Sequence, residues 1–318
     1  MRRDRNSSNN PLHPSYYHSF LTTEDYIIFI DQAFCISMKT FVKNQLLGKT
    51  LATTMRYKPK YKNHFVVIEK KTGRIIPKKY VSEPFFFFHT INAYEENGHI
   101  ICDICCFDDG QAWQDIFGEK QIDIISKTQS GSLAETMYAQ GLKSKAKRFI
   151  LPLDTRGKGN LVRLDSSSAT AFAAKNRIVL TPEILTPESI KFIEMPQIHY
   201  VKCNGRKYRY FYGITRNEQY ITQLAKVDVL TKTAKVLIDK ECNFLEPIFV
   251  PHPDASSEDD GIVLSVALSE KEENKGSLVF LDGKSFQEIA RAEFTAPSAM
   301  VNEFHGIFLG ANNKPFST

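Results

Sequence analysis

The sequence predicts an all-β protein. Its 318 residues contain many short segments in which hydrophobic and polar residues alternate, and polar or glycine-containing turns separate them at intervals of about 8–12 residues. The pairs Asn204-Gly205, Asp260-Gly261 and Asp282-Gly283 are typical of tight turns between antiparallel strands. A helical pattern is confined mainly to residues 130–141. These observations favour a closed β architecture, which means a sandwich, a barrel or a propeller.

The elements can be predicted in order along the chain. Residues 1–10 are polar and predict a disordered tail. Residues 38–48 place Phe41, Val42 and Leu46 at helical spacing, with three lysines nearby. That segment is either an ordinary surface helix or an amphipathic patch that contacts a membrane surface. Strands are expected at residues 26–30, 65–69, 100–106, 148–153, 208–213, 224–230, 234–238, 261–268 and 277–281.

The composition is that of a soluble globular protein, with 42% hydrophobic and 24% charged residues. A net charge of +5 is dispersed along the chain, and no basic stripe with base-stacking aromatic residues indicates a nucleic acid partner. Residues 1–10 lack the apolar stretch of a signal peptide, and no apolar run approaches the ~18 residues of a membrane span, so an intracellular protein is expected. The six cysteines include the cluster Cys102, Cys105 and Cys106, which lacks the second pair of a structural zinc site and predicts buried free thiols.

The residues that can carry chemistry are histidines and glutamates in apolar surroundings. His89 follows four consecutive phenylalanines, and His18 and His305 also lie among aromatic residues. One histidine on an apolar strand is most often a satisfied core residue, but three with such surroundings favour a shared site. Glu194 and Glu246 lie among Ile, Met, Phe and Val, where an unpaired carboxylate is costly to bury. Because carboxylates commonly hydrogen-bond the far nitrogen of metal-bound imidazoles, these five residues predict a ferrous iron site with open positions for dioxygen.

The other five histidines have weaker surroundings. His13 and His252 adjoin prolines, His64 and His99 lie near turns, and His199 alternates with core positions of an expected strand. Solvated or structural roles are predicted for all of them. The acidic run at residues 258–261 lacks the spacing of a calcium loop and predicts a solvated turn.

Several of these stretches together resemble the carotenoid cleavage oxygenases, and most of all the animal β-carotene oxygenase branch with its 9′,10′-cleaving dioxygenase. The resemblance covers the chain after about residue 10 and rests on residues 14–20, 84–96, 194–200, 246–268 and 304–308. It implies that residues 11–318 form the C-terminal portion of a seven-bladed β-propeller whose axial iron is held by four histidines, three of them backed by glutamates.

Residue by residue, the resemblance implies that His18, His89 and His305 are three of the iron ligands. Glu194 would then support His89, and Glu246 would support His305. Members of the family extend further at the N-terminus, and their first histidine ligand and the glutamate behind His18 have no counterpart here. An N-terminally truncated and incomplete propeller is therefore expected.

The function implied by the resemblance is that of an iron(II)-dependent dioxygenase. It would cleave a conjugated double bond of a carotenoid with dioxygen to give apocarotenals or retinoids, with Fe²⁺ as the cofactor and no catalytic residue beyond the metal centre. Peripheral membrane contact and a cytoplasmic or mitochondrial location are expected. Two alternatives stay open, namely a catalytically impaired carotenoid- or retinoid-binding protein and an enzyme similar to the retinoid isomerohydrolase.

Overall fold

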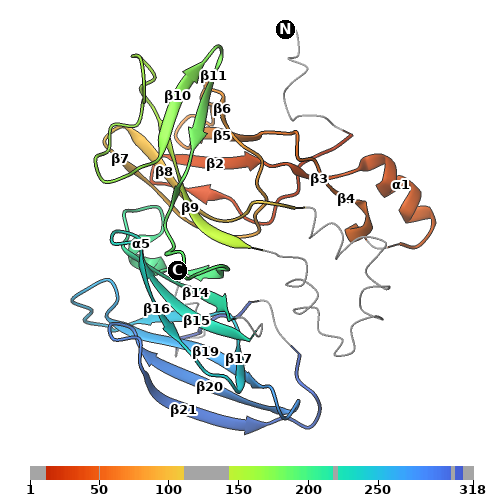
Figure 1. Ribbon diagram of the computed structural model, residues 1–318, viewed down its shortest axis with the longest axis vertical. Helices are drawn as coiled ribbons and strands as arrows, with labels where there is room; N and C mark the ends of the chain where they lie inside the picture. The colour runs from red at the N-terminus through yellow and green to blue at the C-terminus, as the bar shows by residue number, and fades with distance from the viewer. Residues whose placement is uncertain (1–11, 50, 111–142, 218–220, 302–304, 311–318) are drawn as a thin grey trace.

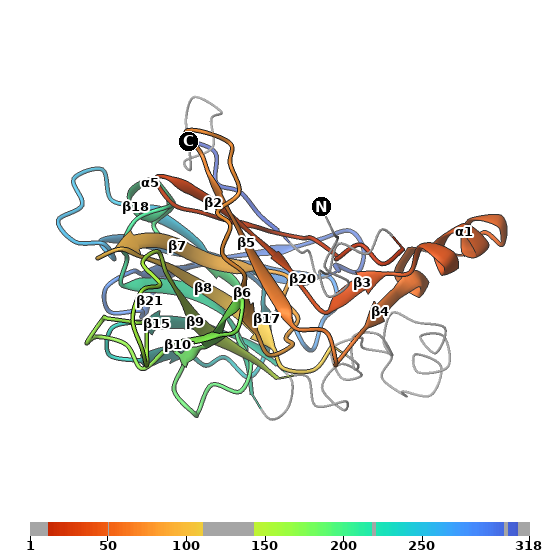
Figure 2. The same cartoon turned by 90° about the horizontal axis from the view of Figure 1, so that it is seen from above.

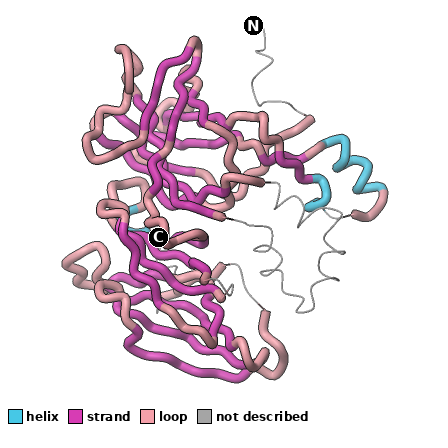
Figure 3. The backbone as a smooth tube through the Cα atoms, in the orientation of Figure 1, coloured by secondary structure: helices cyan, strands magenta, loops and turns pink. Residues whose placement is uncertain are grey.

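Strands make up most of the regular structure in the computed structural model, which confirms the all-β prediction (Figures 1 and 3). The structure describes residues 12–49, 51–110, 143–217, 221–301 and 305–310. The tail predicted for residues 1–10 and the helical pattern at residues 130–141 lie outside these ranges. The described strands form four sheets of four to six strands and one strand pair, and none of these sheets closes on itself.

The first sheet has six strands in the order β1-β2-β5-β6-β11-β10. Buried and more exposed residues alternate along β2 and β5, as the sequence predicts for strands with one face in the core. The buried residues include Ile28, Ile30, Phe65 and Val67. All pairs are antiparallel except β6 with β11. The strands are β1 Leu21–Thr22, β2 Tyr26–Asp31, β5 Asn63–Glu69, β6 Tyr80–Ser82, β10 Thr170–Ala174 and β11 Arg177–Thr181.

The second sheet has the order β12-β9-β8-β7 and is the most deeply buried. All nine residues of β8 are buried, which explains its almost continuous apolar sequence. One charge lies in that strand, Asp103, and its cross-strand neighbour Arg148 binds it with two hydrogen bonds of 2.8 and 2.7 Å. The strands are β7 Thr90–Glu96, β8 His99–Phe107, β9 Ser144–Pro152 and β12 Glu183–Ile184.

The third and fourth sheets form the half of the molecule that lies below the first two in Figure 1. The third has the order β13-β14-β15-β16, and the fourth has the order β17-β19-β20-β21 with β18 also paired to β19. The third-sheet strands are β13 Glu194–Gln197, β14 Tyr210–Arg216, β15 Thr222–Asp228 and β16 Thr233–Leu237. Those of the fourth are β17 Cys242–Phe244, β18 Ile248–Pro251, β19 Gly261–Ser269, β20 Lys275–Asp282 and β21 Glu288–Thr295.

A helical arm extends from the strand pair β3 (Phe34–Ile36) and β4 (Met55–Tyr57). It consists of α1 (Met38–Leu46) and the short 3₁₀ helix η1 (Leu51–Thr54), and it projects away from the sheets in Figure 2. The Ser37 hydroxyl caps α1 by accepting a hydrogen bond from the Thr40 N–H. The predicted helix at residues 38–48 is thus confirmed. None of the helices in the described part of the chain has the length and apolar character needed to cross a bilayer.

Aromatic side chains join the two halves of the molecule. Phe86 and Phe107 pair across an isolated β-bridge, and their rings lie 5.4 Å apart. Phe34, Phe88 and Phe192 continue these contacts, with neighbouring ring centroids 4.6 to 6.3 Å apart. We call these five rings the aromatic cluster. Four of them are buried together with residues of the third and fourth sheets, and Phe88 packs against that group, so the cluster lies where the halves meet.

The Asn204-Gly205 pair does not form the expected hairpin turn. It ends the short helix α5 (Tyr200–Cys203) instead, with Asn204 as the C-cap and Gly205 at φ +76°. A helix end and a hairpin turn both favour glycine in the left-handed region, so the dipeptide alone cannot distinguish them. The strand predicted around His199 is also wrong, because His199 caps the start of the helix α5.

Candidate metal centre

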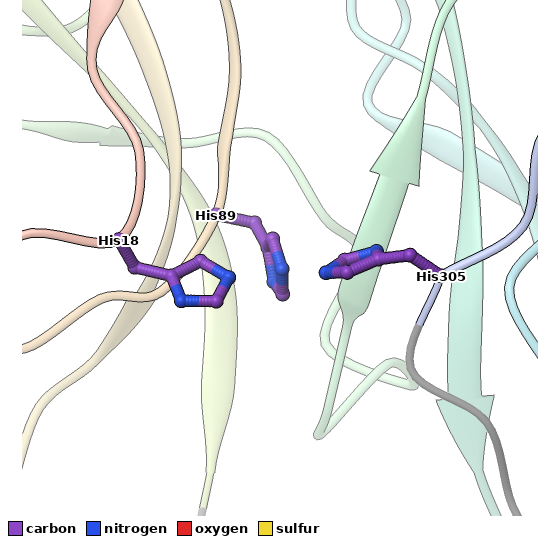
Figure 4. Close-up of side chains that lie close together, drawn as sticks. All are labelled: His18, His89 and His305. Atoms are coloured by element: carbon purple, nitrogen blue, oxygen red, sulfur yellow. The ribbon is translucent and has the colours of Figure 1, made fainter.

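Three predicted histidines converge from distant parts of the sequence. His18 lies just before β1, His89 directly before β7, and His305 beyond β21. Their rings point toward one another in Figure 4, and one ligand atom from each lies within 4.8 Å of the others. The ring centroids are 4.8 Å apart for His18 and His89, and 5.2 Å apart for His89 and His305.

His89 is the most constrained of the three. The apolar residues before it are anchored in the core, where Phe85, Phe86 and Phe87 are almost fully buried. Its Nδ1 lies 2.5 Å from Oε2 of the buried Glu194, at the start of β13. A carboxylate accepts a hydrogen bond and cannot donate one when ionised, so the imidazole proton is held on Nδ1.

The other nitrogen of His89 therefore presents a lone pair. Its Nε2 is buried and has no hydrogen-bond partner within the described ranges. Buried polar atoms are nearly always paired, and an unpaired imidazole nitrogen that faces two more imidazoles is what a divalent metal ion requires. The residues present thus fit a metal ion.

His305 has a matching carboxylate. Its Nδ1 lies 3.1 Å from Oε1 of Glu246, which precedes β18 and is buried. The Gly306 N–H donates to the other carboxylate oxygen at 3.0 Å, and the Gln197 side-chain amide donates to Oε1 at 3.0 Å. Glu246 is thereby held in one orientation, and it directs the far side of the His305 ring toward the cluster.

His18 differs because its Nδ1 meets a phenol and not a carboxylate. The Tyr16 hydroxyl lies 3.3 Å from this nitrogen. Aromatic residues surround His18 in the sequence, but the sequence alone indicates no role for Tyr16. Two residues apart on an extended segment, the two side chains point to the same side, and this spacing is the one signal that links them.

The protonation of these rings follows from their surroundings. Burial lowers the pKa of His18, and the nearby His89 and His305 lower it further, so His18 is neutral at pH 7. Burial also lowers the pKa of His89, but the hydrogen bond and negative charge of Glu194, aided by Glu246, outweigh burial and raise it above its ordinary value. His89 therefore takes up a proton at higher pH than His18, so protons would compete with a metal ion for His89 first as the pH falls.

Two side chains that the sequence analysis missed hold the histidine-bearing segments together. The Ser19 hydroxyl donates to the Phe88 carbonyl at 2.6 Å and accepts from the Thr90 N–H at 3.1 Å, so it bridges both neighbours of His89. The buried Gln32 side chain accepts from the Phe87 N–H at 3.1 Å and donates to the Tyr16 carbonyl at 2.9 Å. Both residues fix the backbone of one histidine relative to another. Serine and glutamine occur widely in strands, so their types carried no signal.

Residues predicted to lie outside the site do so. His99 is buried and its Nδ1 lies 2.8 Å from the Asn97 carbonyl oxygen, and the His199 side chain caps α5. Cys102, Cys105 and Cys106 are buried free thiols of β8. Burial raises the pKa of each, so they stay protonated.

An apolar cavity adjoins the histidine cluster. It has a volume of about 280 Å³ and is lined by His305 and Glu246 together with aliphatic and aromatic residues that include Ile248, Leu264 and Phe308. The Phe88 ring lies 5.5 Å from the His18 ring and 6.3 Å from the His89 ring. Apolar surface therefore borders His305 as well as the pair His18 and His89.

The comparison with protein families identifies the chain. The family described as "Retinal pigment epithelial membrane protein" matches residues 2–310. The chain belongs to this family of carotenoid oxygenases. This confirms the resemblance inferred from the motifs.

Curated members of this carotenoid oxygenase family are similar to the chain over nearly all of its length. The mitochondrial carotenoid-cleaving dioxygenase of Mustela putorius furo is 36% identical over 314 residues, which cover 95% of this chain and 56% of that protein. The beta,beta-carotene 15,15'-dioxygenase of Mus musculus is 32% identical over 310 residues, which cover 95% of this chain and 52% of that protein. The chain spans about half the length of the curated relatives it matches.

The fold of this carotenoid oxygenase chain has solved counterparts. Cobalt-substituted Synechocystis apocarotenoid oxygenase superimposes with a TM-score of 0.65 at 21% identity, over 90% of this chain and 52% of that one. The β-rich architecture is therefore that of the apocarotenoid oxygenase structures.

Proposed function

We propose that the chain carries the metal centre of a non-haem iron(II) dioxygenase that cleaves a conjugated double bond of a carotenoid with dioxygen, giving apocarotenals or retinoids. The observation that carries the proposal is the convergence of His18, His89 and His305, with Nε2 of His89 buried and unpaired in the described part of the chain. Membership of a carotenoid oxygenase family and the names of the relatives support it.

Fe²⁺ is the proposed cofactor. Neutral imidazoles leave the double charge of the ion intact, and a set of three histidines leaves coordination positions free for other ligands. The solved Synechocystis oxygenase exists in a cobalt-substituted form, so that relative can hold cobalt. Bound iron would supply the activation of dioxygen, which amino-acid side chains cannot provide.

The chain itself holds and orients the ligands. Glu194 and Glu246 would keep the protons of His89 and His305 on Nδ1, so that each Nε2 lone pair faces the metal position. Tyr16 would do the same for His18 with a neutral group. No side chain near the cluster is required to act as a general acid or a nucleophile.

The substrate class follows from the surfaces around the cluster and from the relatives. The Phe88 ring borders His18 edge-on, and the buried rings of the aromatic cluster pack behind it, so an extended polyene at the histidines would meet apolar surface. Relatives are named as enzymes that act on carotenoids, and we extend that substrate class to the assembly containing this chain.

The sheets described above are proposed to be blades of a seven-bladed propeller of the carotenoid oxygenase type. The chain forms four sheets, with β10 and β11 returning to the first sheet after β7, β8 and β9 of the second, and the histidines come from segments that flank β1, β7 and β21. In a propeller such segments reach the central axis, where an axial metal is held.

The arm around α1 is proposed to contact membranes peripherally. Val42, Leu46 and Leu47 are exposed there, and Lys39 and Lys43 lie on the same short helix. A cytoplasmic or mitochondrial location is compatible with such contact, and the second is the one printed for the Mustela putorius furo relative. Sedimentation with anionic vesicles tests this: Leu46→Glu should lower the bound fraction, and an unchanged fraction would contradict the proposal.

The test of the function is iron content and carotenoid cleavage in the same preparation. Protein loaded with ferrous iron without oxygen should hold close to one iron per chain and consume dioxygen with a carotenoid. His89→Ala should lose both properties, whereas the matched control His252→Ala, at an exposed turn, should keep both. Full iron content and cleavage in His89→Ala would refute the site.

A further inference from the structure

Two charged side chains behind the histidine cluster have buried atoms without hydrogen-bond partners. Oε2 of Glu194 accepts from His89 and from the Met195 N–H at 3.1 Å, whereas its Oε1 has no partner among the described residues. Arg216 ends β14, and its buried Nε and Nη1 also have none within the described ranges. The carboxylate oxygen lacks a donor and the guanidinium lacks an acceptor, so each group has what the other needs.

The strand register places these two side chains on one face of the third sheet. Glu194 of β13 pairs with Ile214 of β14, and Arg216 lies two residues further along β14. Cross-strand partners and residues two apart share a face, and such diagonal neighbours lie within reach of a long side chain. The guanidinium carbon lies 4.2 Å from the ring centroid of Phe192, two residues before Glu194, which agrees with this register.

The charges of the two groups influence each other. Burial lowers the pKa of Arg216 to about 10, and the negative charge of Glu194 opposes that effect, so Arg216 stays cationic at neutral pH. The two groups are therefore within electrostatic range. One water molecule that accepts from the guanidinium and donates to Oε1 would satisfy both, as buried waters commonly do for polar groups that do not meet directly.

The backbone that carries Glu194 is irregular. Met195 adopts a φ of +51°, in the left-handed region that residues with a Cβ disfavour, and the register of β13 with β14 shifts between Glu194 and Gln197. Strain of this kind persists only where surrounding contacts enforce it. The orientation of the carboxylate that serves His89 therefore depends on contacts made by its side chain as well as on the strand.

We propose that Arg216 is a positioning residue of the metal centre, which holds the Glu194 carboxylate through a bridging water at Oε1 so that Oε2 faces Nδ1 of His89. This deepens the proposed function, on which it rests, by extending the orienting groups from His89 through Glu194 to Arg216. Arg216 acts only through Glu194 and takes no part in bond cleavage.

The test measures the cobalt(II) affinity of the full chain at pH 8 by visible absorption. Arg216→Met removes the donors and should weaken cobalt binding by about fivefold to tenfold, the lower end for groups that orient a metal ligand, because Arg216 acts one step further out. The direction of the change is diagnostic. A cation that only repelled the metal ion would give tighter binding after its removal, so unchanged or tighter binding would overturn the proposal.

A double-mutant cycle shows whether Arg216 acts through the carboxylate. In the Glu194→Ala background, Arg216→Met should have no further effect on cobalt affinity, because no carboxylate is left to hold. A loss that adds in full to that of Glu194→Ala would place the effect of Arg216 on the fold and would overturn the proposal.

Two single variants complete the design. Arg216→Gln keeps a neutral donor and should lose less affinity than the methionine variant. It serves in its place if that protein does not fold, and its loss should also vanish in the Glu194→Ala background. The matched control is Thr186→Val, which removes another buried polar atom without a partner in the described part of the chain and should leave cobalt affinity unchanged.

Carotenoid cleavage by iron-loaded samples of the same proteins separates this proposal from the oxygenase function. A wild-type chain that binds cobalt with the expected dependence on Arg216 but cleaves no carotenoid would overturn only the oxygenase function. An active chain whose cobalt affinity does not depend on Arg216 would overturn only the role of Arg216. A wild-type chain that binds no cobalt would overturn both.

Discussion

Replacing Glu194 by glutamine isolates the effect of one negative charge on the metal site. The change is nearly isosteric, and the amide oxygen can still accept the hydrogen bond from Nδ1 of His89, now 2.5 Å away from a carboxylate oxygen. Both side chains are shielded, with 6% of the Glu194 side chain and 14% of the His89 side chain exposed. Solvent screening is therefore small, and the loss of charge should act at nearly full strength.

The expected magnitude follows from the type of hydrogen bond. A hydrogen bond to a charged group contributes about 1.5–3 kcal/mol, and a neutral one about 0.5–1.5 kcal/mol. Their difference of roughly 1–1.5 kcal/mol corresponds to a fivefold to tenfold lower metal affinity. Glu194→Ala removes the acceptor altogether and should cost closer to a hundredfold, the upper end for groups that orient a metal ligand.

The pH dependence adds a second, independent expectation. In wild-type protein Glu194 raises the pKa of His89, so protons begin to displace the metal at a relatively high pH. Without that charge the pKa of His89 falls, and proton competition moves to lower pH. The gap in affinity between wild-type protein and Glu194→Gln should thus be widest near pH 8 and narrower near pH 6.

Cobalt(II) titration followed by visible absorption measures both effects without oxidation of the metal. The matched control is Glu183→Gln, which changes another buried carboxylate. Glu183 binds Ser167, Ser168 and Lys232, and none of these contacts involves a histidine of the cluster. Its metal affinity should equal that of wild-type protein. The reasoning is refuted if Glu194→Gln binds cobalt as tightly as wild-type protein at pH 8 while its fold is intact.

Three further predictions concern stability and the remaining ligand. Asp103→Ala strands the buried Arg148 guanidinium and should lower the free energy of unfolding by about 3–5 kcal/mol in urea titrations; a loss below 1 kcal/mol would contradict this. Burial opposes ionisation of Asp259, but the hydrogen bond from Lys226 prevails and lowers the pKa of Asp259 in the folded protein. The ion pair therefore stabilises the fold above about pH 4, and this stabilisation is lost as the pH falls through the lowered pKa of the folded state. Lys226→Met should flatten the decline in melting temperature at acid pH, and an unchanged pH profile would argue against the prediction. Tyr16→Phe removes a neutral hydrogen bond and should weaken cobalt binding by about twofold to tenfold, less than Glu194→Ala, and an equal or larger loss would show that the phenol does more than orient its histidine.

The sequence predicts the parts of this structure that depend on local patterns. The alternation in β2 and β5 marks the strands and their buried faces, and the spacing of Phe41, Val42 and Leu46 marks α1. Patterns of this kind do not specify which strands pair. The parallel pairing of β6 with β11 joins segments about a hundred residues apart, and nothing in the sequence of either strand indicates its partner.

The site shows the same division. Histidines among aromatic residues and glutamates among aliphatic ones are chemically unusual, so His89 and Glu194 could be selected from the sequence, and the family resemblance paired them. Ser19 and Gln32 could not be selected, because their roles exist only through backbone atoms contributed by other segments.

The separation of the histidines along the chain has a consequence for the order in which the protein assembles. His18 and His305 lie near opposite ends of the described chain, so a metal ion bound by both would close a loop containing nearly all of it. Such a closure has a high entropic cost before the sheets between them have formed, and almost none afterwards. Metal capture is therefore expected to be a late event that follows folding of the four sheets.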